Sequence, residues 1–151
     1  MKTTFPLLFL LVVALRLGSC VGPTEPHTST QRSAPPSNPN ANAIAQRVAD
    51  IGAGPHSPLP PAERTSVDPT SQVALMVITN DTNYTLTVLY SGPTAQSIVL
   101  LPKASRTVSL AVGSYRVAAT VDAPNVQPFA GNDDLEGGGY DNTFYIETVR
   151  S

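Results

Sequence analysis

The sequence is poor in the residues on which most catalytic and zinc sites depend. Its 151 residues include one cysteine, two histidines and no tryptophan, and both histidines, His27 and His56, precede residue 71. A Ser-His-Asp triad, a Cys-His pair and a typical zinc site each require a histidine or a cysteine. Residues 71–151, where we expect the folded domain, contain neither, so we predict a protein that is not an enzyme.

The apolar run near the start of the chain is too short to cross a bilayer. It extends over the eleven residues from Phe5 to Leu15, and a helix of that length covers roughly half of the ~30 Å hydrocarbon core. The run follows Lys2 and leads into the small residues Gly18 and Ser19, which is the arrangement of a secretory signal. We therefore predict that residues 1–19 form a signal peptide.

The single cysteine stands where that signal ends. Leu17-Gly18-Ser19-Cys20 resembles the lipobox of bacterial lipoproteins, in which a leucine precedes the cysteine by three positions and two small residues lie between them. The resemblance implies that Cys20 carries covalent lipid, including acyl chains such as palmitate, and that Val21 permits transfer to the outer membrane. Several acyl chains, at ~0.8 kcal/mol per buried CH₂, anchor a protein firmly. The alternative is an ordinary signal cleaved nearby, with no lipid.

The charge of the remaining chain excludes an electrostatic fit to nucleic acid. Removal of residues 1–19 takes away Lys2 and Arg16 and leaves seven basic and eleven acidic residues, a net charge of −4. Nucleic-acid binding depends on several phosphate contacts from basic side chains, and no cluster of such side chains is present. We expect the partners to be the membrane, through the lipid anchor, and an envelope protein or polysaccharide.

A proline-rich segment separates the signal from the expected domain. Ten of the fifteen prolines lie between Val21 and Thr70, which predicts a disordered tether over residues 20–70. Within it, Ile44, Val48 and Ile51 have helical spacing, so a short helix over residues 42–51 would form on a supporting surface, with Asn40 or Asn42 as its N-cap and Gly52 as its stop. Limited proteolysis would then leave a fragment that begins near Val73.

The rest of the chain has the alternation of β-strands. We expect strands at residues 73–79, 84–91, 96–101, 106–110 and 116–121, a short piece at 126–129, and a last strand from about Asn142 to Val149. The polar residues from Asn80 to Asn83 predict a turn between the first two strands. The pattern predicts an all-β domain over residues 71–151, an antiparallel β-sandwich of six to seven strands.

The most specific local pattern of the domain is Leu110-Ala111-Val112-Gly113-Ser114-Tyr115. It resembles the tyrosine corner of immunoglobulin-like and fibronectin type III sandwiches. The resemblance implies that the chain turns at Gly113 and that the Tyr115 hydroxyl bonds to the main chain a few residues earlier. We therefore expect Leu110, Gly113 and Tyr115 to have a structural role.

The acidic, glycine-rich stretch from Gly131 to Asn142 is the nearest approach to a ligand site. Carboxylates occur at Asp133, Asp134, Glu136 and Asp141, and oxygen ligands of this kind suit calcium. The spacing differs from that of an EF-hand, and a solvated loop without metal is the competing interpretation. The nearby Tyr140, Phe144 and Tyr145 would form either core pairs or an aromatic contact surface.

Three hypotheses about function follow from these patterns. The first is a membrane-anchored bacterial envelope lipoprotein that presents a small non-catalytic β-sandwich for binding or for a structural role. The second is a secreted protein without lipid, in which Asn80 and Asn83 would be N-glycosylation sites because each begins an Asn-x-Thr sequence. The third is a calcium-dependent binding module that uses residues 131–142.

Overall fold

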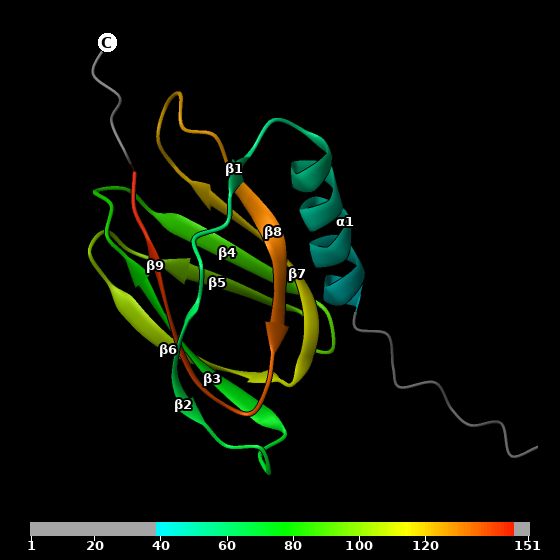
Figure 1. Ribbon diagram of the computed structural model, residues 1–151. Helices are drawn as coiled ribbons and strands as arrows, with labels where there is room; N and C mark the ends of the chain where they lie inside the picture. Colours follow the sequence, from blue (N-terminus) through cyan, green and yellow to red (C-terminus); the bar gives the residue numbers. More distant parts are fainter. Residues whose placement is uncertain (1–38, 147–151) are drawn as a thin grey trace, which may run out of the picture. The chain divides into compact units, whose positions relative to one another are not determined.

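The computed structural model describes residues 39–146. They form two β-sheets that face each other, with one helix on the outside of the first sheet (Figure 1). In chain order the elements are α1 (Pro39–Ala53), β1 (Ser57–Pro58), β2 (Glu63–Val67), β3 (Val73–Asn80), β4 (Leu86–Ser91), β5 (Gln96–Leu100), β6 (Ser105–Ala111), β7 (Gly113–Val121), β8 (Phe129–Leu135) and β9 (Gly138–Phe144).

The strand order confirms an all-β sandwich and changes two details of the prediction. The first sheet has the order β1-β8-β7-β4-β5 and the second β2-β9-β3-β6, so residues 39–146 contain nine strands rather than six or seven. Both sheets are mixed, because β1 is parallel to β8 and β9 is parallel to β3. The second parallel pair arises where the chain crosses between sheets after β8 and enters between β2 and β3.

Helix α1 confirms the helical spacing within the proline-rich segment and shows which surface supports it. Ile44 and Val48 are buried against Leu89 of β4 and Ala118 of β7, and Ile51 packs beside them. Burial of an aliphatic side chain contributes about 1.5–3 kcal/mol, which compensates for the marginal stability of a short isolated helix.

The ends of the helix differ from the predicted ends. The helix begins at Pro39 and continues through Gly52 to Ala53, after which the Gly54 amide donates to the Ile51 carbonyl at 3.2 Å. Proline is well suited to the first helical position because the amide there has no partner within the helix. The N-cap and stop predicted for the segment are therefore wrong by a few residues.

Residues 57–67 connect the helix to both sheets, so the predicted tether is wrong from residue 39 onward. β1 pairs with β8 in the first sheet, and β2 pairs with β9 in the second. Pro58 is tolerated because β1 is an edge strand, where a missing amide costs little. Every residue of β2 is exposed, so its sequence, Glu-Arg-Thr-Ser-Val, carries no apolar alternation. Residues 20–38 of the predicted tether lie outside the described residues.

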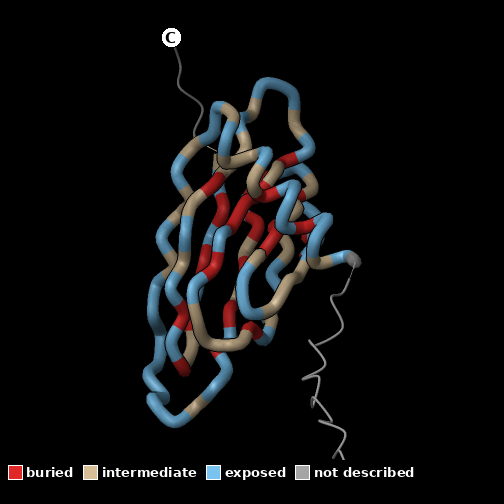
Figure 2. Tube along the Cα trace, turned by 90° about the vertical axis from the view of Figure 1, so that its right-hand side faces the viewer, coloured by how far each residue is buried: buried red, intermediate tan, exposed pale blue. Residues whose placement is uncertain are grey.

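The core lies between the two sheets, and Figure 2 shows the buried residues running through the middle of the described part. The largest fully buried apolar and aromatic side chains come from both sheets: Met76, Ile78, Leu86, Val88, Tyr90, Leu110, Tyr115, Val117 and Phe144. The rings of Phe129 and Phe144 meet across the sandwich, edge to face, with centroids 5.7 Å apart. This contact fixes β8 and β9 relative to each other at one end of the core.

Candidate functional site

The predicted acidic loop is formed mainly by two strands. Asp133 and Asp134 lie in β8 and Asp141 lies in β9, and only Glu136 and Gly137 form the crossing between them. The β8 sequence contains glycine, asparagine and aspartate, which disfavour strands, but its pairing with β7 over Gly113 to Ala119 overrides that preference. Interpretation of this stretch as a loop is therefore wrong.

The four carboxylates do not converge on one point. Glu136 forms an ion pair with Arg64 of β2, with 2.6 Å between Nη1 and Oε2, and Asp134 accepts a hydrogen bond from the Ser114 hydroxyl at 2.5 Å. Asp133 and Asp134 are neighbours in a strand, so their side chains point to opposite faces. Within residues 39–146 no group of three or more histidine, cysteine or acidic side chains could hold a metal ion.

The tyrosine corner has the expected hydrogen bond. The Tyr115 hydroxyl donates to the Ala111 carbonyl, 2.9 Å away and four residues earlier. Gly113 has a φ of +139°, and a Cβ there would lie 2.6 Å from the Pro93 side chain, so glycine is required for both backbone and space. Leu110 is fully buried. The corner joins β6 of the second sheet to β7 of the first.

The turn after β3 is formed as predicted, and it separates the two glycosylation candidates by burial. Asn80 is 0% exposed, and its Nδ2 donates to the carbonyls of Tyr84 and Leu101 at 2.8 and 2.9 Å and to that of Leu100 at 3.3 Å. A glycan on Nδ2 would break this network, so the folded structure disfavours glycosylation at Asn80. Asn83 is exposed.

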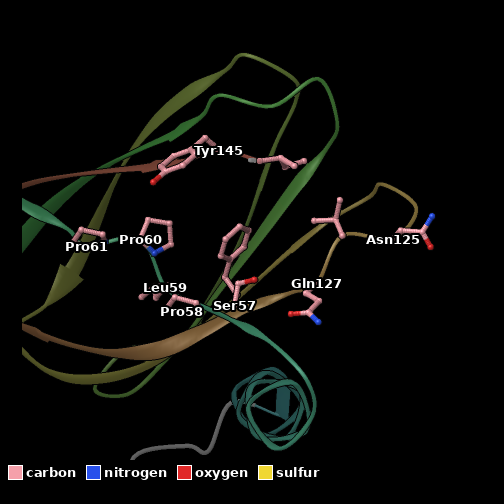
Figure 3. Close-up of a pocket in the computed structure, with 11 residues that line it drawn as sticks. Ser57, Pro58, Leu59, Pro60, Pro61, Asn125, Gln127 and Tyr145 are labelled. Atoms are coloured by element: carbon pink, nitrogen blue, oxygen red, sulfur yellow. The ribbon is translucent and has the colours of Figure 1, made fainter. Parts of the chain in front are cut away.

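The aromatic residues near the end of β9 separate into core and surface. Tyr140 and Phe144 are buried, whereas the side chain of Tyr145 is 51% exposed. Tyr145 lines a pocket of about 460 Å³ in the structure (Figure 3). The pocket is formed by Ser57, Pro58, Leu59, Pro60, Pro61, Asn125, Val126, Gln127, Phe129, Tyr145 and Ile146.

Two local contacts position the walls of this pocket. The Ser57 amide donates to the Pro128 carbonyl at 2.8 Å, which holds β1 against the end of the 122–128 loop. Leu59 lies over Gly131 of β8, where an added Cβ would come within 2.9 Å of the Leu59 Cβ. Glycine at 131 therefore allows the proline-rich wall to lie close to the sheet.

The chemistry of the pocket is that of a neutral binding site. Figure 3 shows the Tyr145 ring across from Pro60 and Pro61, with Gln127 beside β1 and Asn125 at the outer end of its loop. Among residues 39–146, the side chains that line the pocket include no carboxylate, ammonium, guanidinium or imidazole group. Apolar walls with a few uncharged hydrogen-bonding groups are typical of ligand pockets.

Sequence reasoning missed this pocket because five of its eleven lining residues lie in the predicted tether. The signal that could have revealed it is the run of prolines at 58, 60 and 61, which is rigid enough to build a wall. The same error placed His56 outside the domain. His56 is exposed beside the pocket wall, with Nδ1 2.8 Å from the Gly54 carbonyl oxygen.

Cys20 and the rest of residues 1–38 lie outside the described residues, so the lipobox prediction is untouched by the structure. In the described part of the chain, no helix has the combined length and apolar character that crossing a bilayer demands.

The chain gives no match to models of known protein families, and a search of curated proteins gives none either.

Proposed function

We propose that the chain is a lipid-anchored protein of a bacterial envelope, and that its β-sandwich binds an uncharged stretch of polysaccharide without catalysing a reaction. The observation that carries the binding role is the composition of the pocket, which combines an exposed tyrosine ring, three prolines and neutral polar side chains. The lipobox-like Leu17-Gly18-Ser19-Cys20 supports the anchor. The proposed tether is residues 20–38.

A neutral sugar fits this lining by its chemistry. Sugar rings present apolar C–H faces and uncharged hydroxyl groups, and a tyrosine offers an apolar ring face with a polar tip. Ser57 and Gln127 provide neutral hydrogen-bonding groups within the same lining. An anionic or cationic ligand would lose its hydration without gaining an ion pair there.

Among the residues that the structure describes, the lining has no charged side chain, and this supports a non-catalytic role. General acid–base catalysis requires a titratable group within hydrogen-bond reach of the reacting atoms. In the described part of the lining, the tyrosine hydroxyl of Tyr145 is the one titratable group. The proposed function is therefore recognition.

The anchor is tested by intact mass and membrane fractionation of the wild type, Cys20→Ser and the matched control Ser33→Ala. We expect acyl mass and membrane association in the wild type and the control, and loss of both in Cys20→Ser. The anchor would be overturned if all three proteins were soluble and each had the mass of its own chain without acyl groups. Added glycan mass at Asn83 would instead support the secreted alternative.

The binding role is tested by NMR titration of the full chain with chitohexaose and maltohexaose, and with a hexamer of galacturonate as the anionic comparison. We expect signals of Tyr145 and Gln127 to shift with a neutral hexamer and not with the anionic one. Tyr145→Ala should weaken binding at least about tenfold, or ~1.4 kcal/mol.

Tyr84→Ala is the matched control, because Tyr84 is a 44% exposed tyrosine outside the pocket lining. It should bind as the wild type does. The proposal would be contradicted if Tyr84→Ala weakened binding as much as Tyr145→Ala does. It would also be contradicted if neither neutral hexamer shifted the signals of Tyr145 and Gln127. Capture of a peptide in the pocket in place of sugars would contradict it as well.

A further inference from the structure

Three polar side chains lie in the interior of the sandwich, among apolar neighbours. Tyr90 of β4 is 0% exposed and Asn142 of β9 is 1% exposed, while Asp133 of β8 is partly buried. Asn142 alternates with the buried Tyr140 and Phe144 on β9, so it faces the core. These three residues come from both sheets.

The strand register places Tyr90 and Asp133 near each other on the core face of the first sheet. Tyr90 pairs with Val117, and Val117 pairs with Gly131, so these positions form one row across the first sheet. Asp133 follows two positions later on β8 and shares a face with Gly131. The rings of Phe129 and Phe144 are in contact across the core. Gly131 lies two residues after Phe129, and Asn142 lies two residues before Phe144. Asn142 therefore faces the row that contains Gly131.

These side chains have polar atoms without a hydrogen-bond partner. Within residues 39–146, the buried side-chain atoms that lack one are Tyr90 Oη, Asp133 Oδ2, Asn142 Oδ1 and Asn142 Nδ2. Each such group costs about 1–3 kcal/mol, and more than about 90% of buried polar groups in proteins are satisfied. The four atoms belong to three side chains that face the same core, so a partner shared between the two sheets would remove this cost.

The electrostatics agree with this placement. Burial raises the pKa of Tyr90, and the charge of Asp133 raises it further. Burial also raises the pKa of Asp133, with a smaller contribution from the neighbouring Asp134. The influence of Asp133 on the pKa of Tyr90 agrees with the positions that the strand register gives these two residues.

We propose that the interior of the sandwich has a built site for bound water, which bridges Tyr90, Asp133 and Asn142 between the two sheets. Water both donates and accepts hydrogen bonds, and the site offers both kinds of group. The Asn142 amide nitrogen and the tyrosine hydroxyl donate, whereas the Asn142 and Asp133 oxygens accept. A metal cation would use only the oxygens and leave the Asn142 amide hydrogens without an acceptor, so water is the better match. Internal water with three polar partners is typical of globular proteins.

The direct test is ¹⁷O relaxation dispersion of water in solutions of the full chain. We expect at least one water molecule to stay bound longer than the rotational correlation time of the protein and so to contribute to the measured dispersion. Asn142→Leu should abolish that contribution, and Tyr90→Phe should reduce it. The control Tyr115→Phe removes a hydroxyl that bonds the Ala111 carbonyl elsewhere, and it should leave the contribution intact.

Several results would overturn the proposal. The first is the absence of any long-lived water. The second is a water contribution to the relaxation dispersion that is the same in the wild type and both interior variants. The third is a crystal structure in which Tyr90, Asp133 and Asn142 form hydrogen bonds directly with one another. A stoichiometric metal ion found by elemental analysis and lost in Asp133→Asn would also overturn it. If Asn142→Leu does not fold, as judged by thermal melting, Tyr90→Phe decides the question because it removes one atom.

Discussion

The two sheets of the sandwich differ in what covers their outer faces. In the first sheet, Leu89 and Ala118 point outward and are buried beneath α1. In the second sheet, Leu75 of β3 points outward and is half exposed. The cover over the first sheet comes from residues that precede the strands in the chain. Segment 39–67 is therefore an integral part of the domain, because it covers one sheet, pairs with both and supplies a wall of the pocket.

The largest expected effect is a difference between two leucines on these outer faces. Leu89→Ala should lower the free energy of unfolding by about 2–5 kcal/mol, because it leaves a cavity under the helix. Leu75→Ala should change it by less than about 1 kcal/mol, because that side chain already contacts solvent. Urea denaturation measures both, and equal losses would show that α1 does not cover the first sheet in solution.

The next effect concerns a link between the sheets. Asn80 ends β3 of the second sheet and donates to the carbonyls of Leu100 and Leu101 at the end of β5 in the first. Asn80→Ala should cost about 2–4 kcal/mol, since it removes three hydrogen bonds that Nδ2 donates to buried and partly buried carbonyl groups. Asn83→Ala, at an exposed position in the same turn, should stay within about 0.5 kcal/mol. If Asn80→Ala lowered the free energy of unfolding no more than Asn83→Ala does, the hydrogen-bond network would be refuted.

A smaller effect is expected at the tyrosine corner, which also joins the two sheets. Tyr115→Phe removes the hydrogen bond to the Ala111 carbonyl and keeps the buried ring. The expected loss is about 0.5–1.5 kcal/mol by urea denaturation. Tyr84→Phe is the exposed control and should be neutral. A neutral Tyr115→Phe would mean that packing of the ring alone holds the corner.

The smallest expected effects are two opposite changes of stability with pH. One arises from Asp133 in the first sheet and the other from Asp68, which follows β2 of the second sheet. Burial raises the pKa of Asp133 in the first sheet, so the folded chain binds more protons above the ordinary value of 3.8, and stability falls as the pH rises from there. Hydrogen bonds from Thr70 lower the pKa of Asp68 after β2, so stability is lost as the pH falls below 3.8. Asp133→Asn should remove only the first trend from urea midpoints measured between about pH 3 and pH 7.

Much of the fold could be predicted because the strands from β3 to β7 alternate clearly. Met76, Ile78, Val88, Val117 and Val121 fall where the period of two requires them. The helix was visible in the spacing of Ile44, Val48 and Ile51. Such patterns depend on burial of one face, which the sequence records directly.

The rest could not be predicted because tertiary contacts decide it. β2 has no buried residue, and β8 contains strand-breaking residues that pairing with β7 overrides. The pocket joins Pro60 and Pro61 to Tyr145, which lie far apart in the sequence. The acidic stretch looked like a ligand loop because composition does not show that a strand separates Asp133 and Asp134 onto opposite faces.

The most direct test of the central claim, that residues 39–67 belong to the domain, is limited trypsin digestion of the full chain with N-terminal sequencing. Arg47 lies in α1 and Arg64 in β2, whereas Arg32 precedes the described residues. We predict that the first stable fragment begins at Ser33, with helix, edge strands and pocket wall intact. A first fragment that begins at Val48 or Thr65 would contradict the account, because segment 39–67 would then be a tether beside a smaller sandwich.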